Sequence, residues 1–340
     1  MSANEMKKRI EYIDLAKGFC ICLVVLFHMS MFYEVTLPGN AFMKSFRMPL
    51  YFFLSGCFFK TYGGLLDFVK RKVNKLLIPF VFFYIVCSFA IPNFVAVVLH
   101  ANMRYLPFSQ LPTAWLGEIY PAGAIWFLLC LFEINLLFYL MFLVTRHSSH
   151  QNVLLSVLSL AIGMTGISLG MNGINLPANV DSALSALPFF VMGYMTFRHT
   201  PLLQPNSLDR YLPLTIAASL ALTWLLAPDF SFLDNAFYDN AWLWVYPCGA
   251  LGVYGVVMLA KLLQRLPLFS YYGRYSIMIL VTHDTVFHLF GSVLQRVVSD
   301  TELQFVCNFV ITLLAYLLII PFMRRFMPHV TAQKDVIRVN

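Results

Sequence analysis

Long apolar runs separated by short polar segments dominate the chain. A helix that crosses a bilayer needs about 20 apolar residues, and most of the runs approach or exceed this length. The runs are continuous rather than alternating, so they predict helices and not the strands of a membrane barrel. The expected fold class is therefore all-α, a polytopic membrane helix bundle with about ten transmembrane helices. These lie at 13–33, 46–60, 77–99, 123–145, 152–171, 182–197, 211–227, 241–262, 272–295 and 303–323.

Composition and charge add an orientation to this bundle. The 340 residues are 60% hydrophobic and only 11% charged, whereas a soluble domain has about 25% charged residues. With the N-terminus inside, 18 Lys and Arg residues fall on the cytoplasmic side and four on the other, namely Lys44, Arg47, Arg104 and Arg296. The positive-inside rule thus predicts that both termini are cytoplasmic. We expect a single integral membrane domain over 1–330, followed by a short cytoplasmic tail at 331–340.

The net charge of +7 does not require a nucleic-acid partner. The positive-inside rule and attraction to anionic membrane lipid account for it, so the expected partners include membrane lipid and exclude nucleic acid.

The first apolar run contains three ionisable residues, Asp14, Lys17 and His28. Such side chains are costly in lipid and indicate a functional site. On a helix Asp14 and Lys17 share a face and can pair, whereas His28 lies about 16 Å beyond Lys17 along the axis. This places Lys17 near the inner surface and His28 in the outer half of the membrane. A snorkelling lysine and a hydrogen-bonded structural histidine remain the simpler alternative.

A second group of polar residues lies in the ninth run, which contains Arg274, His283, Asp284 and His288. Asp284 and His288 are four residues apart and can pair on a helix. The two histidines are five apart, a spacing that matches none of the common zinc motifs, so no metal is expected. In the fourth run, Glu133 is either a proton-relay group or a partner for a polar neighbour.

The segment at 65–76 alternates apolar and basic positions with a helical period. Leu65, Val69, Val73 and Leu76 share one face, which predicts an amphipathic helix lying on the inner membrane surface. It would bind lipid headgroups or, alternatively, hold a phosphate-bearing substrate. Its basic residues are Lys70, Arg71, Lys72 and Lys75.

Four stretches taken together resemble acyltransferase family 3, a family of integral membrane enzymes. They are 9–18 running on to His28, the Met-Pro-aromatic-Ser-Gly pattern within 46–56, the basic run 70–79 that ends in proline, and 273–276 leading to His283. Trp126 and Phe127 match a weaker feature of the family. Lys17 stands where many members have arginine, which keeps the charge but loses the planar two-pronged contact. The branch resembling fucose 4-O-acetylases often has this lysine, but it also often has histidine where this chain has Arg47.

The resemblance implies acyl transfer, with acetyl as the default group, from cytoplasmic acyl-CoA to a hydroxyl of an envelope glycan or lipid-linked sugar. Acetyl-CoA would be a donor substrate rather than a permanently bound cofactor, and the enzyme would lie in a bacterial cytoplasmic membrane. His28 and His283 are the expected catalytic residues. The expected donor-binding residues are Lys17, Arg71, Lys72, Lys75 and Arg274. The expected acceptor-binding residues are Arg47, Ser55, Trp126 and Glu133, with Asp14 and Asp284 in structural pairs.

A rival hypothesis is a proton-coupled transporter or flippase for a sugar precursor. Ten spans with buried His, Glu and Asp residues would suit proton-coupled export. The sequence shows no inverted repeat and no matching pair of Gly- or Pro-broken spans, which favours the acyltransferase.

Overall fold

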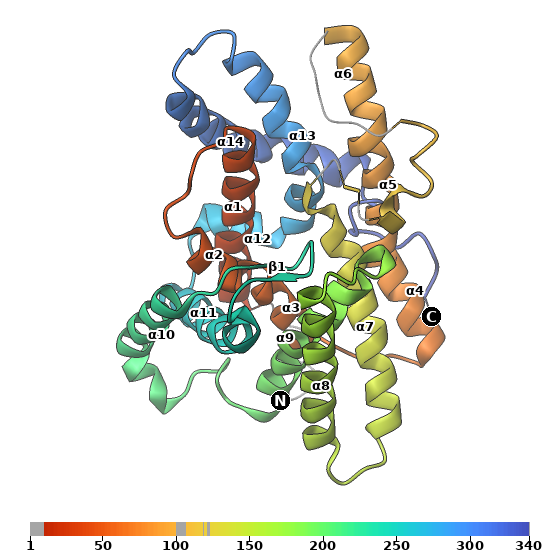
Figure 1. The fold of residues 1–340 in the computed structure, drawn as a ribbon, viewed down its shortest axis with the longest axis vertical. Helices are drawn as coiled ribbons and strands as arrows, with labels where there is room; N and C mark the ends of the chain where they lie inside the picture. The colour runs from red at the N-terminus through yellow and green to blue at the C-terminus, as the bar shows by residue number, and fades with distance from the viewer. Residues whose placement is uncertain (1–9, 100–106, 118, 121–122, 340) are drawn as a thin grey trace.

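The computed structural model describes residues 10–99, 107–117, 119–120 and 123–339. Eight helical segments in this part of the chain are long and apolar enough to cross a membrane. The all-α, polytopic membrane bundle is thereby confirmed (Figure 1). Lys7, Lys8, Arg9 and Arg104, which contributed to the predicted orientation, lie outside the described residues.

The α-helices are α1 (Glu11–Phe32), α2 (Asn40–Arg47), α3 (Pro49–Cys57), α4 (Leu65–Lys72), α5 (Ile78–Ile85), α6 (Ile91–Leu99), α7 (Trp126–Thr145), α8 (Gln151–Met171), α9 (Val180–His199), α10 (Leu212–Leu226), α11 (Ala241–Leu263), α12 (Pro267–Arg274), α13 (Ser276–Leu294) and α14 (Thr301–Phe326). A two-residue hairpin, β1 (Phe230–Ser231) and β2 (Ala236–Phe237), lies in the loop between α10 and α11.

Two of the ten predicted spans are shorter than expected. The span predicted at 46–60 is divided into α2 and α3, and the one at 211–227 is α10, with 15 residues. The division falls at Met48, directly before Pro49, which occupies the first turn of α3. Proline is tolerated there because its missing N–H would be unpaired in any helix start.

Polar contacts that tie loops and helix ends together fall into two sets, one on each predicted side of the membrane. The contacts on the predicted cytoplasmic side join Tyr12 to Leu203, Lys261 to Asp209 and Asn74 to Ile337. Those on the opposite side join Lys44 to Asp229 and Asn179 to Leu233. None of these contacts connects the two sets, as expected if the chain crosses the membrane in alternating directions. The shorter α2–α3 pair and α10 also run from one side to the other.

The amphipathic helix expected on the membrane surface is instead the start of a longer helix. Leu65–Ala96 is one helical segment of 32 residues, interrupted by π-helical turns at Val73–Leu77 and Val86–Ala90. Each π turn ends two residues before a proline, Pro79 or Pro92, and contains the carbonyl four residues before that proline. Because proline cannot donate to that carbonyl, widening the turn lets the helix continue. The prediction of a helix separate from the following span was therefore wrong, whereas its place on the inner membrane surface stays a prediction.

Glycine pairs bring two pairs of helices into backbone contact. A Cβ on Gly18 would lie 1.9 Å from the Phe269 carbonyl oxygen, and one on Gly273 would lie 1.7 Å from that of Asp14. Only glycine allows α12 to approach α1 so closely. This contact fixes α12, and through it the start of α13, against α1.

The second crossing has the same construction. A Cβ on Gly56 of α3 would lie 1.9 Å from the Phe190 carbonyl oxygen, and one on Gly193 of α9 would lie 1.8 Å from that of Phe53. Small residues at such crossings are typical of membrane helix pairs, which gain their stability from close packing.

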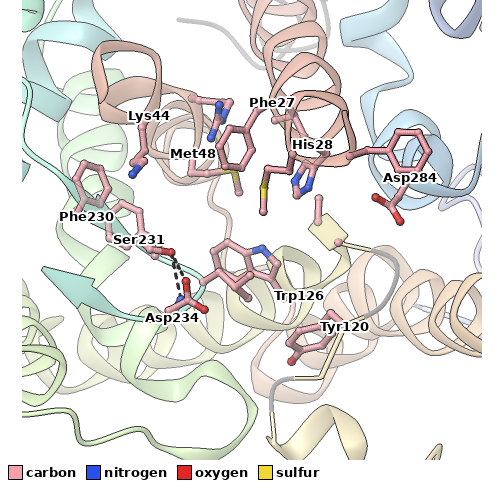
Figure 2. Close-up of a pocket in the computed structure, with 18 of the residues that line it drawn as sticks. Phe27, His28, Lys44, Met48, Tyr120, Trp126, Phe230, Ser231, Asp234 and Asp284 are labelled. Carbon is pink, nitrogen blue, oxygen red and sulfur yellow. Dashed lines mark hydrogen bonds between the residues drawn. The ribbon is translucent and has the colours of Figure 1, made fainter. Parts of the chain in front are cut away.

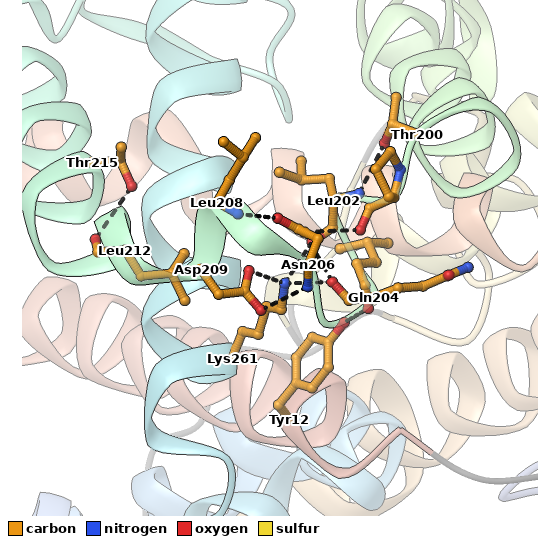
Figure 3. Close-up of polar contacts among 12 residues, drawn as sticks. Tyr12, Thr200, Leu202, Gln204, Asn206, Leu208, Asp209, Leu212, Thr215 and Lys261 are labelled. Atoms are coloured by element: carbon orange, nitrogen blue, oxygen red, sulfur yellow. Dashed lines mark hydrogen bonds and ion pairs between the residues drawn. The ribbon is translucent and has the colours of Figure 1, made fainter.

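A buried lysine holds the loop between α9 and α10 on the predicted cytoplasmic side (Figure 3). Lys261 is 4% exposed and donates to the carbonyls of Leu202 and Gln204, at 3.0 and 2.7 Å, and to the Asp209 carboxylate at 2.6 Å. Asp209 also accepts from the backbone N–H of Asn206. The hydrogen bond from Lys261, followed by that from Asn206, lowers the pKa of Asp209 below its ordinary value.

The described part of the predicted cytoplasmic tail lies against the first π turn. The Asn74 side chain accepts from the N–H groups of Val336 and Ile337, both at 2.9 Å, and donates to the Ile337 carbonyl. Lys75 pairs with Asp335 at 3.0 Å and donates to the Ala332 carbonyl. The tail therefore packs beside α4, where the C-terminus lies in Figure 1.

Candidate active site

His28 of α1 and His283 of α13 meet inside the bundle. Their ring centroids are 5.1 Å apart, with the planes inclined by 62°. The contact depends on helices from opposite ends of the sequence, and the glycine crossing of α12 with α1 helps to hold them in place. The sequence analysis assigned chemistry to both histidines, and the structure brings them together.

The His283 ring is oriented by its own helix. Its Nδ1 lies 3.0 Å from the carbonyl oxygens of both Ile279 and Leu280. Since carbonyls only accept, Nδ1 carries the proton and Nε2 carries the lone pair. Nε2 is buried and has no hydrogen-bond partner among the described residues. His283 thus offers a fixed, unoccupied acceptor beside His28.

His28 faces a cavity of about 430 Å³, here called the outer cavity (Figure 2). In Figure 2, His28 and Asp284 lie on one side of it, Trp126 faces them, and Asp234 is hydrogen-bonded to Ser231 on a third wall. Its lining includes Phe27, His28, Lys44, Arg47, Met48, Tyr120, Trp126, Ser231, Asp234, Asp284 and His288.

Gly123 makes room for two polar groups at one end of the outer cavity. A Cβ at this position would lie 3.2 Å from His28 Nδ1 and 3.4 Å from an Asp284 carboxylate oxygen. His28 and Asp284 are therefore close neighbours. Asp284 also lies 3.7 Å from the ring of His288, as its spacing predicted, although the shorter contact of that ring, 2.7 Å, is with the Asp284 backbone carbonyl.

Arg47 is buried at the outer cavity without a carboxylate partner in the described chain. Only 5% of the residue is exposed, and its guanidinium carbon lies 4.0 Å from the centroid of the Phe27 ring. One terminal nitrogen, Nη1, is buried and has no hydrogen-bond partner among the described residues. A cation–π contact of this kind contributes about 2 kcal/mol when desolvated, less than the several kcal/mol that burying a charge costs.

A second cavity, of about 440 Å³, contains three of the predicted donor-binding lysines and is here called the inner cavity. Lys17 approaches from α1, and Lys72 and Lys75 approach from the long helix that begins with α4. The other lining residues are Ile21, Tyr51, Leu54, Ser55, Phe58, Leu76, Phe127, Leu128, Leu131, Ser276, Ile277 and Leu280.

The two cavities use the same helices, one turn apart. Ile21 and Leu280 line the inner cavity, whereas Val24 and Asp284, about one turn further along α1 and α13, line the outer one. On α7, Phe127 lines the inner cavity and its neighbour Trp126 lines the outer one. The cavities therefore lie end to end, with lysines in one and His28 in the other.

An aromatic pair lies where the inner cavity approaches the outer one. The rings of Tyr51 and Phe127 are 5.7 Å apart, and the Tyr51 hydroxyl donates to the Lys17 carbonyl at 2.9 Å. Tyr51 follows Met48, which lines the outer cavity, by three residues. The sequence analysis did not single out Tyr51, although it falls within the Met-Pro-aromatic stretch.

The remaining predicted site residues divide between the cavities or lie outside their linings. Ser55, predicted to bind acceptor, lines the inner cavity, and Trp126 lines the outer one. Glu133, Arg71 and Arg274 are not among the described residues that line either cavity. Arg71 stacks on the ring of Tyr62 at 4.5 Å, while Arg274 is exposed.

The predicted Asp14–Lys17 pair stays a prediction. Asp14 is 8% exposed and lies at the crossing of α1 with α12. Among the described residues, no group of three or more His, Cys, Asp or Glu side chains is placed to hold a metal ion.

Comparison with known protein families gives one match, and it covers most of the chain. The family model described as an acyltransferase domain, acyltransferase family 3, matches residues 10–324. The chain belongs to this family. The match includes α1 through most of α14, so both cavities and both histidines fall within it. Comparison with curated proteins and with solved structures finds no match.

Proposed function

We propose that this membrane acyltransferase moves an acyl group, acetyl in the first instance, from acyl-CoA in the inner cavity to a sugar hydroxyl in the outer cavity. The acceptor would be an envelope glycan or lipid-linked sugar, and the location a bacterial cytoplasmic membrane. The observation that carries the proposal is the end-to-end placement of a lysine-lined cavity and a histidine-lined cavity on shared helices.

The inner cavity suits the donor because its charges match those of CoA. Lys17, Lys72 and Lys75 provide three ammonium groups on the side where the predicted cytoplasmic loops lie. Ammonium groups bind phosphates as point charges. The remaining lining is largely apolar and aromatic, which suits the pantetheine arm. His28 lies about 16 Å along α1 from Lys17, so the arm must extend past Tyr51 and Phe127 to present its thioester.

The chemical step assigns a separate task to each histidine. An unprotonated ring nitrogen of His28 takes the proton from the acceptor hydroxyl, while the hydroxyl oxygen attacks the thioester carbonyl carbon. A C–O bond forms and the C–S bond breaks, so the electron pair leaves on the CoA sulfur, which takes up the proton carried by His28. His283, with its lone pair fixed beside the His28 ring, orients that ring or relays the proton.

The test is His28-dependent thioester consumption by purified protein in detergent. Radiolabelled acetyl-CoA is supplied with and without membrane glycolipid from the host, and wild type is compared with His28→Ala. His199→Ala is the matched control, because His199 is exposed at the end of α9. We expect CoA release and label transfer to lipid-linked sugar in wild type and the control only. Equal turnover in His28→Ala, with normal membrane insertion, would refute the role of His28.

A separate test asks whether the inner cavity binds the acyl donor. Lys72→Met should raise the KM for acetyl-CoA without changing the KM for the acceptor, because Lys72 lines only the inner cavity. Lys70→Met, which alters a neighbouring lysine outside that lining, is its control. An equal effect of the two substitutions would indicate nonspecific attraction by the basic helix.

A further inference from the structure

We propose that Arg47 forms an anion-binding subsite in the outer cavity, and that the acceptor carries a carboxylate or phosphate group near the hydroxyl that is acylated. This inference rests on the proposed function and specifies the chemical class of its acceptor. It begins from a charged side chain that is buried, faces the cavity and lacks an ionic partner among the described residues.

The way Arg47 packs leaves its hydrogen-bonding edge available. The Phe27 ring lies 4.0 Å from the guanidinium carbon and contributes a cation–π contact. Such a contact does not occupy the N–H donors, which lie in the guanidinium plane. Nη1 has no acceptor in the described chain. A planar fork with free donors fits the two oxygens of a carboxylate or a phosphate.

The other cations and anions of the outer cavity have protein contacts. Lys44 is paired with Asp229 at 2.7 Å. Asp234 accepts a hydrogen bond from Ser231 at 2.8 Å, and the Asp284 carboxylate lies 3.7 Å from the His288 ring. Among the described residues that line the cavity, Arg47 is therefore the cation without a carboxylate partner, and Asp234 and Asp284 carry their negative charges on other parts of the wall.

The position of Arg47 relates the subsite to the reacting hydroxyl. Phe27 lies between the two groups, since its ring centroid is 5.3 Å from that of His28 and 4.0 Å from the Arg47 guanidinium carbon. An acceptor anchored on Arg47 would thus present a hydroxyl to His28 from the same sugar or the next one. Burying an unpaired charge is unfavourable, and an acceptor anion would remove that cost only in the complex.

The test compares neutral and anionic sugars by calorimetry on purified protein in detergent at low salt. The probes are methyl β-D-glucoside, methyl β-D-glucuronide and glucose 1-phosphate. We expect wild type to bind at least one anionic probe ten-fold or more tightly than the neutral one. Arg47→Met should abolish this preference and Arg47→Lys should retain part of it. Lys44→Met, at a lysine that lines the same cavity, should retain the preference.

The anionic probes identify the source of the charge. A preference for the glucuronide indicates an acidic sugar, and a preference for the phosphate indicates a phosphorylated or lipid-linked one. Equal binding of all three probes by wild type, or a preference that survives in Arg47→Met, would overturn the proposal. If Arg47→Met does not fold, Arg47→Lys replaces it, because lysine keeps the charge but loses the planar fork. A preference of the same size in Arg47→Lys and wild type would then count against the subsite.

Failure of the anion-binding subsite can be distinguished from failure of the proposed acyl transfer. Arg47-dependent anion binding without turnover of any acyl-CoA would refute acyl transfer and leave the subsite standing. His28-dependent transfer to an uncharged glycan, with no effect of Arg47→Lys on the acceptor KM, would refute the subsite and leave acyl transfer standing.

Discussion

Replacing Gly273 by alanine tests whether the crossing of α1 and α12 positions the site. The new methyl group would lie 1.7 Å from the Asp14 carbonyl oxygen and 2.5 Å from the Gly18 nitrogen, where ordinary contact begins near 3.4 Å. Both obstacles are backbone atoms of α1, so rotation of a side chain cannot relieve the clash. The helices must separate by about 1.5 Å, which opens a gap along the crossing.

The expected cost follows from two opposing effects. Overpacking costs about 1–3 kcal/mol, and a backbone obstacle favours the upper end of that range. Alanine is preferred over glycine in a helix by about 1 kcal/mol, which offsets part of the loss. We expect a net destabilisation of about 2 kcal/mol, roughly a 30-fold increase in the unfolding equilibrium constant. Because α12 leads into Ser276, which lines the inner cavity, the KM for acyl-CoA should rise as well.

The assay is reversible unfolding in mixed detergent micelles, followed by the KM for acetyl-CoA of the folded fraction. Gly117→Ala is the matched control, because a Cβ at Gly117 would meet nothing within 4 Å. A Gly273→Ala protein that is as stable as the control, or more stable than wild type, would show that α12 moves freely against α1. The argument that glycine fixes this crossing would then be wrong.

Three further predictions concern the predicted cytoplasmic side. Lys261→Met should destabilise the fold by about 3 kcal/mol, since it removes a buried ammonium group that donates to two carbonyls and a carboxylate. Arg265→Met, at an exposed residue, should be neutral in the same unfolding assay. Because the pKa of Asp209 is lowered in the fold, its contribution is present at neutral pH and is lost as the pH falls below the ordinary value of 3.8. An Asp209→Asn protein with an unchanged acid limb in its stability profile would contradict this. Asp335→Asn should release Lys75 and lower the KM for acetyl-CoA about two-fold at low salt, an effect that high salt removes.

The sequence was sufficient for the fold class, and it singled out the two histidines that the structure brings into contact. Continuous apolar runs are a direct consequence of crossing lipid, and an ionisable residue such as His28 is conspicuous within one. The pairing of His28 with His283 was not accessible in the same way, since a helical period relates residues within one helix only. That contact depends on α13 packing against α1, which involves the backbone contacts of Gly18 and Gly273. The sequence alone does not name the partners of these glycines.

Local rules also failed where helices adjust to proline. The division at Met48 and the two π turns reflect how Pro49, Pro79 and Pro92 are accommodated, and apolar periodicity does not distinguish these solutions. Arg274 illustrates a different limit. The sequence predicts that it lies on the cytoplasmic side and binds CoA, yet its side chain is exposed and does not line the inner cavity. The predicted side of the membrane does not fix the direction in which a side chain points.

The two π turns have a consequence for interpreting variants of the long helix. Each π turn holds roughly one residue more than an α turn, and one residue corresponds to a rotation of about 100°. A helical wheel drawn from α6 back to α4 therefore accumulates an error of about 200°, more than half a revolution. Measurements of side-chain accessibility between Leu65 and Ala96 should therefore be plotted on three separate helical wheels, one each for α4, α5 and α6. A single-residue deletion within Val73–Leu77 would convert a π turn into an α turn and rotate Lys72 relative to the membrane-spanning part, without shortening the bundle.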